Sequence, residues 1–396
     1  HMGPPCKPIV AKGDTVKVGT KIGDSDAFLS APIHSSVSGT VSAIEEIVTS
    51  NGGRSQVGII QTDGEQTVDE NVKPPVISNH PEFVQAIKES GLVGLGGAGF
   101  PTHIKLNPKN LSEVDTLVVN AAECEPYITS DYRTIIERPQ DVLDGIEAIK
   151  KYVGITQVKI AIEDNKERAV SILTDKLKQQ DEVELVVLPT RYPQGAEKQL
   201  IQAVTGRQVP SGGFPKDVGC AVFNIATCAS VCRAVADGEP ILRRIVTITG
   251  HGIKEPKNLI VPIGTPFAHA IEAAGGLQGD VWKVIAGGPM MGRSQADLST
   301  LVIKGTNAIV ALTSADDLES PHPSCIRCGR CVSVCPMGLQ PLYLYRFSRC
   351  RDVGMLRQYS ILDCVECGCC AYTCPGKLPI VAAIREGKQR VREEPS

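Results

Sequence analysis

The sequence is poor in aromatic residues, has no long apolar run and carries no large excess of either charge. Phe, Trp and Tyr make up 4% of its 396 residues, with a single Trp. No apolar run approaches the ~20 residues that a membrane-spanning helix requires, so we expect no direct membrane span. Forty-one Lys and Arg nearly balance 44 Asp and Glu, and the net charge of −3 lacks the basic excess typical of nucleic-acid-binding proteins. The composition therefore argues against an integral membrane protein and against a nucleic-acid partner.

Cysteine, in contrast, is plentiful, and eight of the fifteen cysteines fall in two runs with one spacing. Residues 325–336 read C-I-R-C-G-R-C-V-S-V-C-P and residues 364–375 read C-V-E-C-G-C-C-A-Y-T-C-P, so both follow C-x2-C-x2-C-x3-C-P. In two-cluster ferredoxins this spacing supplies three thiolates to one [4Fe–4S] cluster and the fourth thiolate to the other. The pattern predicts a first cluster bound by Cys325, Cys328, Cys331 and Cys374, and a second bound by Cys364, Cys367, Cys370 and Cys335.

Other uses of these cysteines fit the spacing less well. Zinc sites use two pairs of ligands, whereas each run here has four cysteines followed by a proline. A disulfide framework suits short secreted chains, and this long chain shows no secretory signal. The seven remaining cysteines are odd in number and scattered, which fits reduced intracellular thiols. Cys228 and Cys232 could form half of a metal site on one helix face, but we expect them to be small buried core residues.

The length predicts about two to four domains, and residues 1–70 have the pattern of a small all-β unit. The signatures K-G-D-T-V-K-V-G-T-K-I-G and A-P-I-H-S-S-V-S-G-T-V resemble the biotinyl/lipoyl hammerhead, a barrel-sandwich fold that carries its cofactor on a hairpin lysine. The matching hairpin, residues 24–29, has no lysine. The resemblance therefore implies a module that braces or docks, without a swinging arm. We expect His34 to be an ordinary surface residue.

A glycine-rich stretch follows a polar linker, residues 66–80, and a predicted helix that runs from Pro81 to Gly91. Five glycines lie between positions 91 and 99, and those at 94, 96 and 99 satisfy G-x-G-x-x-G. A preceding helix and the nearby Pro101 are the wrong context for a dinucleotide fingerprint. Exposed backbone amides in such a loop form an anion cradle, and Lys105 adds a cation suited to a phosphate. A purely structural glycine turn is the alternative.

Strands then alternate with helices, which indicates a mostly parallel sheet with ligands at the carboxyl ends of its strands. The pattern predicts strands at 116–121, 158–162 and 184–188, and helices at 139–152, 171–178 and 196–204. Polar side chains and a glycine follow two of the strand ends: Asn120, Glu123 and Glu125 after the first strand, and Tyr192, Gly195 and Glu197 after the third. Residues 78–240 are thus a predicted α/β domain with its site at that edge.

Four motifs in this domain, G-L-G-G-A-G-F-P-T, N-A-A-E-C-E-P, Y-P-Q-G-A-E and F-N-I-A-T, resemble the flavin-bearing subunit of respiratory complex I. Nearly the whole chain more closely resembles the RnfC family of the Rnf electron-transport complex. The resemblance implies FMN as cofactor and NAD(H) as substrate of a Rossmann-like domain. By position it assigns cofactor contacts to Gly94, Gly96, Gly97, Gly99, Lys105, Asn120, Glu123, Tyr192, Gly195, Asn224 and Thr227, and catalytic roles to Glu197 and Glu125.

This chain departs from the complex I pattern at three positions. Leu95 stands where those relatives have arginine, Ala122 where they have aspartate, and Ala196 where they have the first of two glutamates. We expect these three changes to affect FMN binding less than they affect binding of NADH in the orientation found in complex I.

The rest of the chain is predicted to form two further units. Residues 241–315 return to β character around a helix at 267–274, and they resemble the SLBB β-grasp module. A polar linker, residues 316–324, leads into a two-cluster domain that extends to residue 396. Residues 341–362, between the two cysteine runs, are predicted to be helical, and we expect an α-helical ferredoxin domain. The basic tail at 385–392 is predicted to be a solvated helix end.

A function follows from joining these parts. A hydride donor delivers two electrons, a cluster accepts one, and a flavin converts between the two. The resemblance implies a peripheral Rnf subunit at the cytoplasmic face of the membrane, which exchanges electrons between NAD(H) and ferredoxin through FMN and two [4Fe–4S] clusters. Other Rnf subunits would reach ferredoxin and couple the flow to Na⁺ or H⁺. Two alternatives stay open: a soluble RnfC-like protein feeding an amino-acid reductase such as proline reductase, and a flavin-free relay scaffold.

Overall fold

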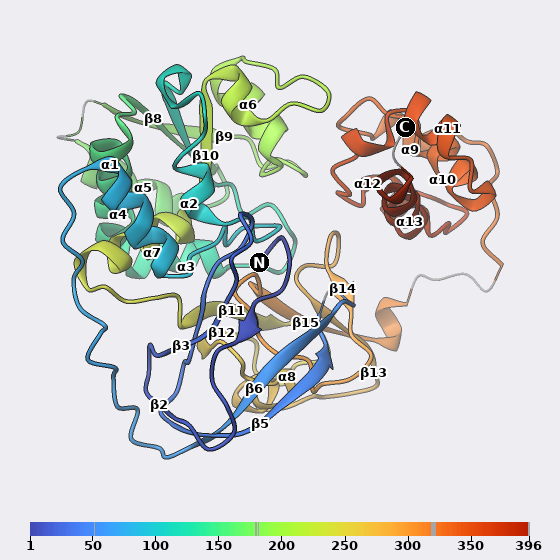
Figure 1. The fold of residues 1–396 in the computed structure, drawn as a ribbon. Helices are drawn as coiled ribbons and strands as arrows, with labels where there is room; N and C mark the ends of the chain where they lie inside the picture. The colour runs from blue at the N-terminus through green and yellow to red at the C-terminus, as the bar shows by residue number, and fades with distance from the viewer. Residues whose placement is uncertain (51, 179, 181, 318–321, 395–396) are drawn as a thin grey trace.

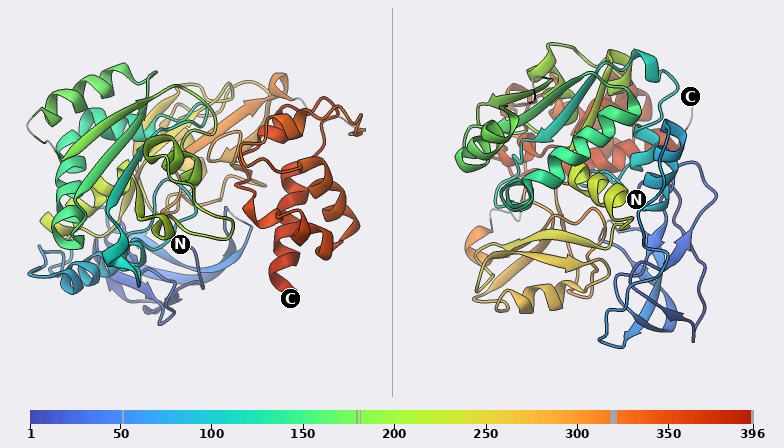
Figure 2. Two further views of the ribbon diagram at one scale, coloured as in Figure 1. Left: turned by 90° about the horizontal axis from the view of Figure 1, so that it is seen from above. Right: turned by 90° about the vertical axis from the view of Figure 1, so that its left-hand side faces the viewer.

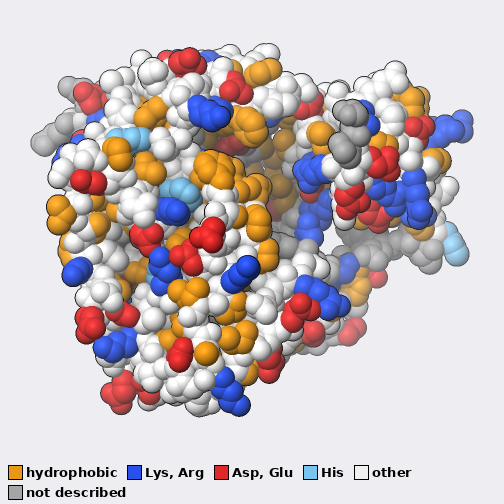
Figure 3. Space-filling model, in the orientation of Figure 1, with side chains coloured by type: hydrophobic (Ala, Val, Ile, Leu, Met, Phe, Trp, Pro, Cys, Tyr) orange, Lys and Arg blue, Asp and Glu red, His pale blue; other side chains and the backbone are white. Residues whose placement is uncertain are grey.

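The computed structural model describes residues 1–50, 52–178, 180, 182–317 and 322–394, and it shows several units along one chain (Figures 1 and 2). Four separate sheets divide between an N-terminal β unit, an α/β domain and a second β-rich unit, and a helical lobe follows. A recess separates this lobe from the body in the space-filling view (Figure 3). The predicted multidomain α/β architecture is therefore confirmed. None of the helices in the described ranges is long and apolar enough to cross a membrane.

The N-terminal unit consists of two three-stranded sheets, ordered β1–β3–β4 and β2–β5–β6. The long hairpin of β5 and β6 pairs antiparallel from Gly39 opposite Thr62 to Val48 opposite Arg54, with one bulge after Val41. The strands are β1 (Lys7–Pro8), β2 (Thr15–Val16), β3 (Lys21–Asp24), β4 (Ile33–His34), β5 (Gly39–Val48) and β6 (Arg54–Thr62).

One prediction for this unit is wrong, because His34 is buried. Its exposed fraction is 8%, and burial together with the nearby Lys304 ammonium lowers the pKa of His34 to about 3. Lys304 lies in the second β-rich unit and is itself buried. Its Nζ donates to the carbonyls of Pro32 (2.5 Å) and Gly91 (2.6 Å). This one side chain therefore connects the second β-rich unit with the N-terminal unit and with the α/β domain, at the start of the glycine-rich stretch.

The α/β domain has a parallel four-stranded sheet in the order β10–β7–β8–β9. Its strands are β7 (Thr116–Ala121), β8 (Gln157–Glu163), β9 (Val183–Leu188) and β10 (Cys220–Asn224). The helices are α1 (His80–Glu89), α2 (Thr102–Lys105), α3 (Ser130–Glu137), α4 (Pro139–Val153), α5 (Glu167–Leu177), α6 (Glu197–Thr205) and α7 (Ile225–Ala236). The helix predicted to begin at residue 171 begins earlier, at Glu167.

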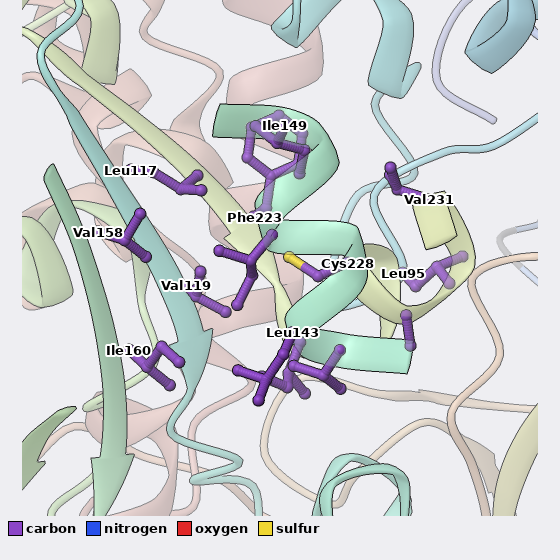
Figure 4. Close-up of a cluster of buried hydrophobic side chains, with 14 of the residues drawn as sticks. Leu95, Leu117, Val119, Leu143, Ile149, Val158, Ile160, Phe223, Cys228 and Val231 are labelled. Atoms are coloured by element: carbon purple, nitrogen blue, oxygen red, sulfur yellow. The ribbon is translucent and has the colours of Figure 1, made fainter. Parts of the chain in front are cut away.

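The continuous apolar run of β7 follows from its place inside the sheet. Leu117 and Val119 belong to the core under α4 and α7, whereas Val118 belongs to a second core on the opposite face (Figure 4). Close contact of α4 with α7 requires Gly145, because a Cβ there would lie 1.8 Å from the carbonyl oxygen of Cys228. Cys228 is fully buried in this core, as expected, whereas Cys232, which was also expected to be buried, is only partly so.

The second β-rich unit is a mixed five-stranded sheet in the order β12–β11–β15–β13–β14. The pair β11–β15 is parallel and the other pairs are antiparallel. Helix α8 covers one face, with Phe267 packed on Val246 and Ile248. The elements are β11 (Arg243–Thr249), β12 (Lys257–Pro262), α8 (Phe267–Ala273), β13 (Val281–Ala286), β14 (Arg293–Ser294) and β15 (Ala308–Thr313).

The C-terminal lobe is helical over the residues that the structure describes, as predicted. It contains α9 (Arg330–Ser333), α10 (Pro341–Cys350), α11 (Val353–Gln358), η4 (Ile361–Asp363), α12 (Cys369–Tyr372) and α13 (Ile380–Glu393). Part of the predicted linker, residues 318–321, lies outside the described residues.

Two predictions for the lobe need correction. Residues 341–362 do not form one helix, because Arg351 has φ 59° and Asp352 caps a new helix by accepting from the amide of Met355. The basic tail is not solvated either. Ile384 and Val391 of α13 are buried, and Lys388 donates to Glu366 (2.7 Å), so the tail packs against the rest of the lobe.

Candidate flavin and cluster sites

The glycine loop is a closed turn whose tip faces open space. The amide of Gly94 donates to the carbonyl of Phe100 (2.8 Å), and that of Leu95 donates to the hydroxyl of Thr227 (3.0 Å). Leu95 is buried in the core, so the residue that replaces the arginine of complex I relatives points away from the tip. Gly96 and Gly97 are exposed, and a Cβ on Gly97 would meet nothing within 4 Å. These exposed amides fit the close approach of a phosphate.

Asn224 lies against this loop and forms hydrogen bonds to helices α3 and α7. Its side-chain oxygen accepts from the amides of Ala226 (2.9 Å) and Thr227 (3.3 Å) and so caps α7, while its Nδ2 donates to the partly buried carboxyl group of Asp131 (2.6 Å). A Cβ on Gly96 would lie 2.7 Å from that same Nδ2. The glycine at position 96 therefore leaves room for the Asn224 side chain.

Lys105 and Glu197, which the sequence assigns to different parts of the site, form an ion pair. Lys105 ends α2, Glu197 begins α6, and their Nζ and Oε2 atoms are 2.9 Å apart. The ammonium also donates to the carbonyl of Val222 (3.2 Å), in the middle of β10. Both side chains are partly exposed, at 30% and 41%, so the pair remains accessible to a ligand.

The loops that follow β7 and β9 are bonded to each other. Asn120 Nδ2 donates to the carbonyl of Gly195 (2.9 Å), and the amide of Gly195 donates to the Cys124 sulfur (3.4 Å). A Cβ on Gly195 would lie 3.1 Å from the carbonyl oxygen of Ala122. The structure thus brings the predicted acidic loop and the tyrosine turn together at one edge of the sheet.

The two glutamates of the acidic loop accept hydrogen bonds from backbone amides. Glu123 accepts from Asp131 (2.7 Å) and Tyr132 (3.1 Å) at the start of α3, and burial with the nearby Asp131 carboxyl raises the pKa of Glu123 to about 8. Glu125 accepts from Met290 (3.2 Å) and Met291 (2.7 Å) in the second β-rich unit, and burial raises its pKa. Sequence reasoning missed this last contact, although the run G-G-P-M-M-G marks a loop with close backbone approach.

The α/β domain and the second β-rich unit both touch the second cysteine run. Tyr192 donates its hydroxyl to the carbonyl of Cys367 (2.6 Å), and burial raises the pKa of this phenol. Gly368 lies so close to Met290 that a Cβ would approach its carbonyl oxygen to 2.5 Å. Arg385 of α13 donates to the carbonyl of Met291 (2.9 Å). The second run therefore lies directly against the loops of the candidate flavin site.

The eight predicted cluster cysteines line two cavities. The first cavity is lined by Cys325, Cys328, Cys331 and Cys374, together with apolar residues that include Leu342, Leu378 and Ile380. The second is lined by Cys335, Cys364, Cys367 and Cys370, together with residues that include Leu339, Leu344 and Ile384. These two groups are the crossed sets expected from the spacing.

The two cysteine runs also share a backbone conformation. Arg327 and Glu366, each two residues after the first cysteine of its run, both have φ 56°, and glycines follow at φ 76° and φ 86°. In the described ranges, no three His, Cys, Asp or Glu side chains converge as ligands of one metal ion. Four thiols around an apolar cavity are suited to a polynuclear iron–sulfur group.

Family models match the four units in order. They are the RnfC barrel sandwich hybrid domain at residues 1–65, the Nuo51 FMN-binding domain at 87–233, the SLBB domain at 245–294 and a 4Fe-4S dicluster domain at 324–377. An FMN-binding domain joined to a dicluster domain defines an electron-transfer oxidoreductase chain. The FMN and [4Fe–4S] cofactors expected from the sequence are thereby confirmed.

Full-length relatives specify the family. The chain is 44% identical over 399 residues to the C subunit of the proton-translocating ferredoxin:NAD(+) oxidoreductase complex of Clostridium ljungdahlii, covering 99% of this chain and 86% of the relative. It is 42% identical over 395 residues to the C subunit of the Na(+)-translocating ferredoxin:NAD(+) oxidoreductase complex of Acetobacterium woodii, covering 99% and 89%. The chain belongs to this RnfC family, as the sequence resemblance indicated.

A solved structure supports the fold alone. The chain matches a structure titled as an NAD+-reducing [NiFe]-hydrogenase with a TM-score of 0.53 and 17% identity, covering 80% of this chain and 64% of that one.

Proposed function

We propose that this chain exchanges electrons between NAD(H) and a ferredoxin-linked acceptor, as a peripheral subunit of an Rnf-type complex. The observation that carries the proposal is the hydrogen bond from Tyr192, in the flavin domain, to Cys367, in the second cysteine run (2.6 Å). A flavin converts between the two-electron chemistry of a hydride and the one-electron chemistry of a cluster. A direct hydrogen bond between the flavin domain and the second cysteine run supports that conversion within one chain.

The FMN phosphate would be held by the amides at the glycine-loop tip, with the Lys105 ammonium beside them. Gly96 and Gly97 supply exposed amides, and Thr227 fixes the loop by accepting from Leu95. The remaining predicted contacts lie in the loop, in the loops after β7 and β9, and at the end of β10. They are Gly94, Gly99, Asn120, Glu123, Tyr192, Gly195 and Asn224, and we propose nicotinamide-orienting roles for Glu197 and Glu125.

We propose the crossed ligand sets for the two clusters. Cys325, Cys328, Cys331 and Cys374 would hold the first cluster, and Cys364, Cys367, Cys370 and Cys335 the second, because each set lines one cavity. The hydrogen bond from Tyr192 to Cys367 supports a position of the second cluster on the flavin side of the lobe.

Ion translocation would belong to partner membrane subunits at the cytoplasmic face of the membrane. Relatives named for proton and for Na⁺ translocation are 44% and 42% identical to this chain over nearly its whole length. That near-equal similarity supports an ion choice made by the partners, with this chain supplying the electron transfer common to both.

The experiment is a comparison of cofactor content and reduction in three variants. Lys105→Ala should release FMN while the iron content is retained, because it removes the cation that we assign to the phosphate, and exposed Lys109→Ala is the matched control. Glu197→Gln should slow reduction by NADH while dithionite still reduces the clusters. Failure of NADH to bleach the flavin of the unmodified protein would overturn the proposal, and equal loss of FMN and iron in Lys105→Ala would indicate misfolding.

A further inference from the structure

The C-terminal lobe has the opposite charge to the rest of the chain. Residues 322–394 contain eleven Lys and Arg against six Asp and Glu, a formal charge of +5, whereas the remainder carries −8 within a net charge of −3. Blue Lys and Arg side chains are prominent on this lobe in Figure 3, with some acidic side chains among them. Such an asymmetry orients a charged partner before contact, since the body repels an anionic protein and the lobe attracts it.

Four arginines of the lobe lie near the first cysteine set. Arg327 and Arg330 are within the first run, and Arg346 and Arg349 lie on α10. The α10 pair shares a helix face with Leu342, four and seven residues earlier, and Leu342 lines the cavity of that set.

All four of these arginines are exposed, and none forms an ion pair with a carboxylate in the described part of the chain. Near the second set, in contrast, Arg385 and Lys388 both pair with Glu366. The positive charge of these four arginines, which no carboxylate of the described residues neutralises, therefore lies on the side of the lobe that holds the first cysteine set.

The two cysteine sets also differ in access. Cys325 and Cys328 of the first set are exposed, whereas Cys367 and Cys370 of the second are buried, with Tyr192 against them. Ile326, between the two exposed cysteines, is itself 67% exposed. Exposed apolar side chains interleaved with arginine are typical of protein interfaces, and small interfaces of this kind serve transient redox encounters.

We infer that this arginine face, defined as Ile326, Arg327, Arg330, Arg346 and Arg349, docks an acidic one-electron carrier protein at the first cluster. The inference rests on the proposed function and adds where the partner binds and what charge it carries. One electron passes in each encounter, so one side is oxidised and the other reduced by one, and no bond forms or breaks and no proton moves. The second cluster, on the flavin side, is the internal member of the pair.

The test measures binding of an acidic plant-type [2Fe–2S] ferredoxin, used as the probe, to the cofactor-loaded full chain. Arg346→Glu/Arg349→Glu should lower the association rate at low salt by about tenfold or more, and association with the unmodified chain should slow as salt is raised. Lys12→Glu/Arg168→Glu is the control, because it makes the same charge change at exposed positions in other units. This control should stay within about twofold of the unmodified rate.

Two further measurements keep the result decisive. Arg346→Gln/Arg349→Gln tests the same charges without introducing repulsion, and a basic cytochrome c should bind better to the glutamate variant than to the unmodified chain. An equal loss in the control variant, or association that does not change with salt, would overturn the arginine face. Failure of NADH to reduce the unmodified chain is a separate readout that overturns the proposed function and leaves the binding result standing.

Discussion

Gly96 and Gly97 are neighbours at the glycine-loop tip, yet an added methyl group would affect them differently. A Cβ on Gly96 would lie 2.7 Å from Asn224 Nδ2 and 2.9 Å from its Cβ, whereas one on Gly97 would meet nothing within 4 Å. Gly96→Ala should therefore displace the Asn224 side chain. That side chain caps α7 and donates to the partly buried carboxyl group of Asp131. Gly97→Ala should leave both interactions in place.

The cost of displacing Asn224 follows from the two interactions that it would lose. Loss of an N-cap costs about 0.5–2 kcal/mol, and loss of a hydrogen bond to a buried charged group costs about 1.5–3 kcal/mol. Partial relaxation of the loop leaves an expected cost of about 2–4 kcal/mol for opening α7. Each 1.4 kcal/mol is a factor of ten, so opening becomes about 30- to 1,000-fold more frequent. Gly97→Ala should cost less than about 1 kcal/mol.

Hydrogen exchange of peptides that cover α7, measured on flavin-free protein, reports this local opening. Exchange in Ile225–Ala236 should accelerate by the stated factor in Gly96→Ala and stay nearly unchanged in Gly97→Ala. Peptides of the C-terminal lobe provide the internal reference in both variants. Equal exchange of α7 in the two variants would refute the role assigned to Asn224.

Three other predictions concern buried and bridging groups. Burial lowers the pKa of Lys304 to about 7, against about 10.4 in the unfolded chain, so the unfolded chain binds more protons between these values. The free energy of unfolding should therefore rise with pH, by about 3 kcal/mol from pH 7 to pH 9.5. Lys304→Met should flatten that rise in urea unfolding at pH 7 and 9.5 followed by Trp fluorescence; parallel curves would contradict it. In stopped-flow absorbance, Tyr192→Phe should slow reduction of the clusters by NADH several-fold, while the flavin and iron content stay unchanged. A rate equal to that of the unmodified protein would show that the hydroxyl is dispensable. Cys374→Ser should perturb the EPR of the first cluster alone and Cys335→Ser that of the second; the reverse pattern, with Cys374→Ser and Cys364→Ser damaging the same cluster, would disprove crossed ligation.

The parts of the fold that could be predicted are those specified by local pattern. Strand β7 was predicted at its observed bounds because an apolar run buried on both faces leaves a strong signal. The break between α10 and α11 was missed because it depends on one left-handed residue, Arg351, which is neither Gly nor Asn. The packing of α13 was missed because Arg385 and Lys388 look solvated until Glu366 is placed beside them.

The candidate site likewise has features that the sequence could predict and features that it could not. The cysteine sets follow from spacing alone, since the motif fixes its own geometry. The contacts of Glu125 with the amides of Met290 and Met291 span more than 160 positions, so no local pattern could indicate them. His34 was misjudged for a similar reason, because Lys304 and Gly91 bury it from other units.

The buried ammonium of Lys304 has a consequence for how this chain can be divided or recombined. Its hydrogen bonds end on carbonyls contributed by two other units, at Pro32 and Gly91. Excising any one of the three would leave a buried charge or buried carbonyls without partners, at a cost of several kcal/mol. Chimeras between relatives should therefore tolerate exchange of residues 1–315 as one block, whereas a crossover inside that block should lower the yield of soluble protein wherever the incoming segment does not bring its backbone carbonyls to the Lys304 ammonium.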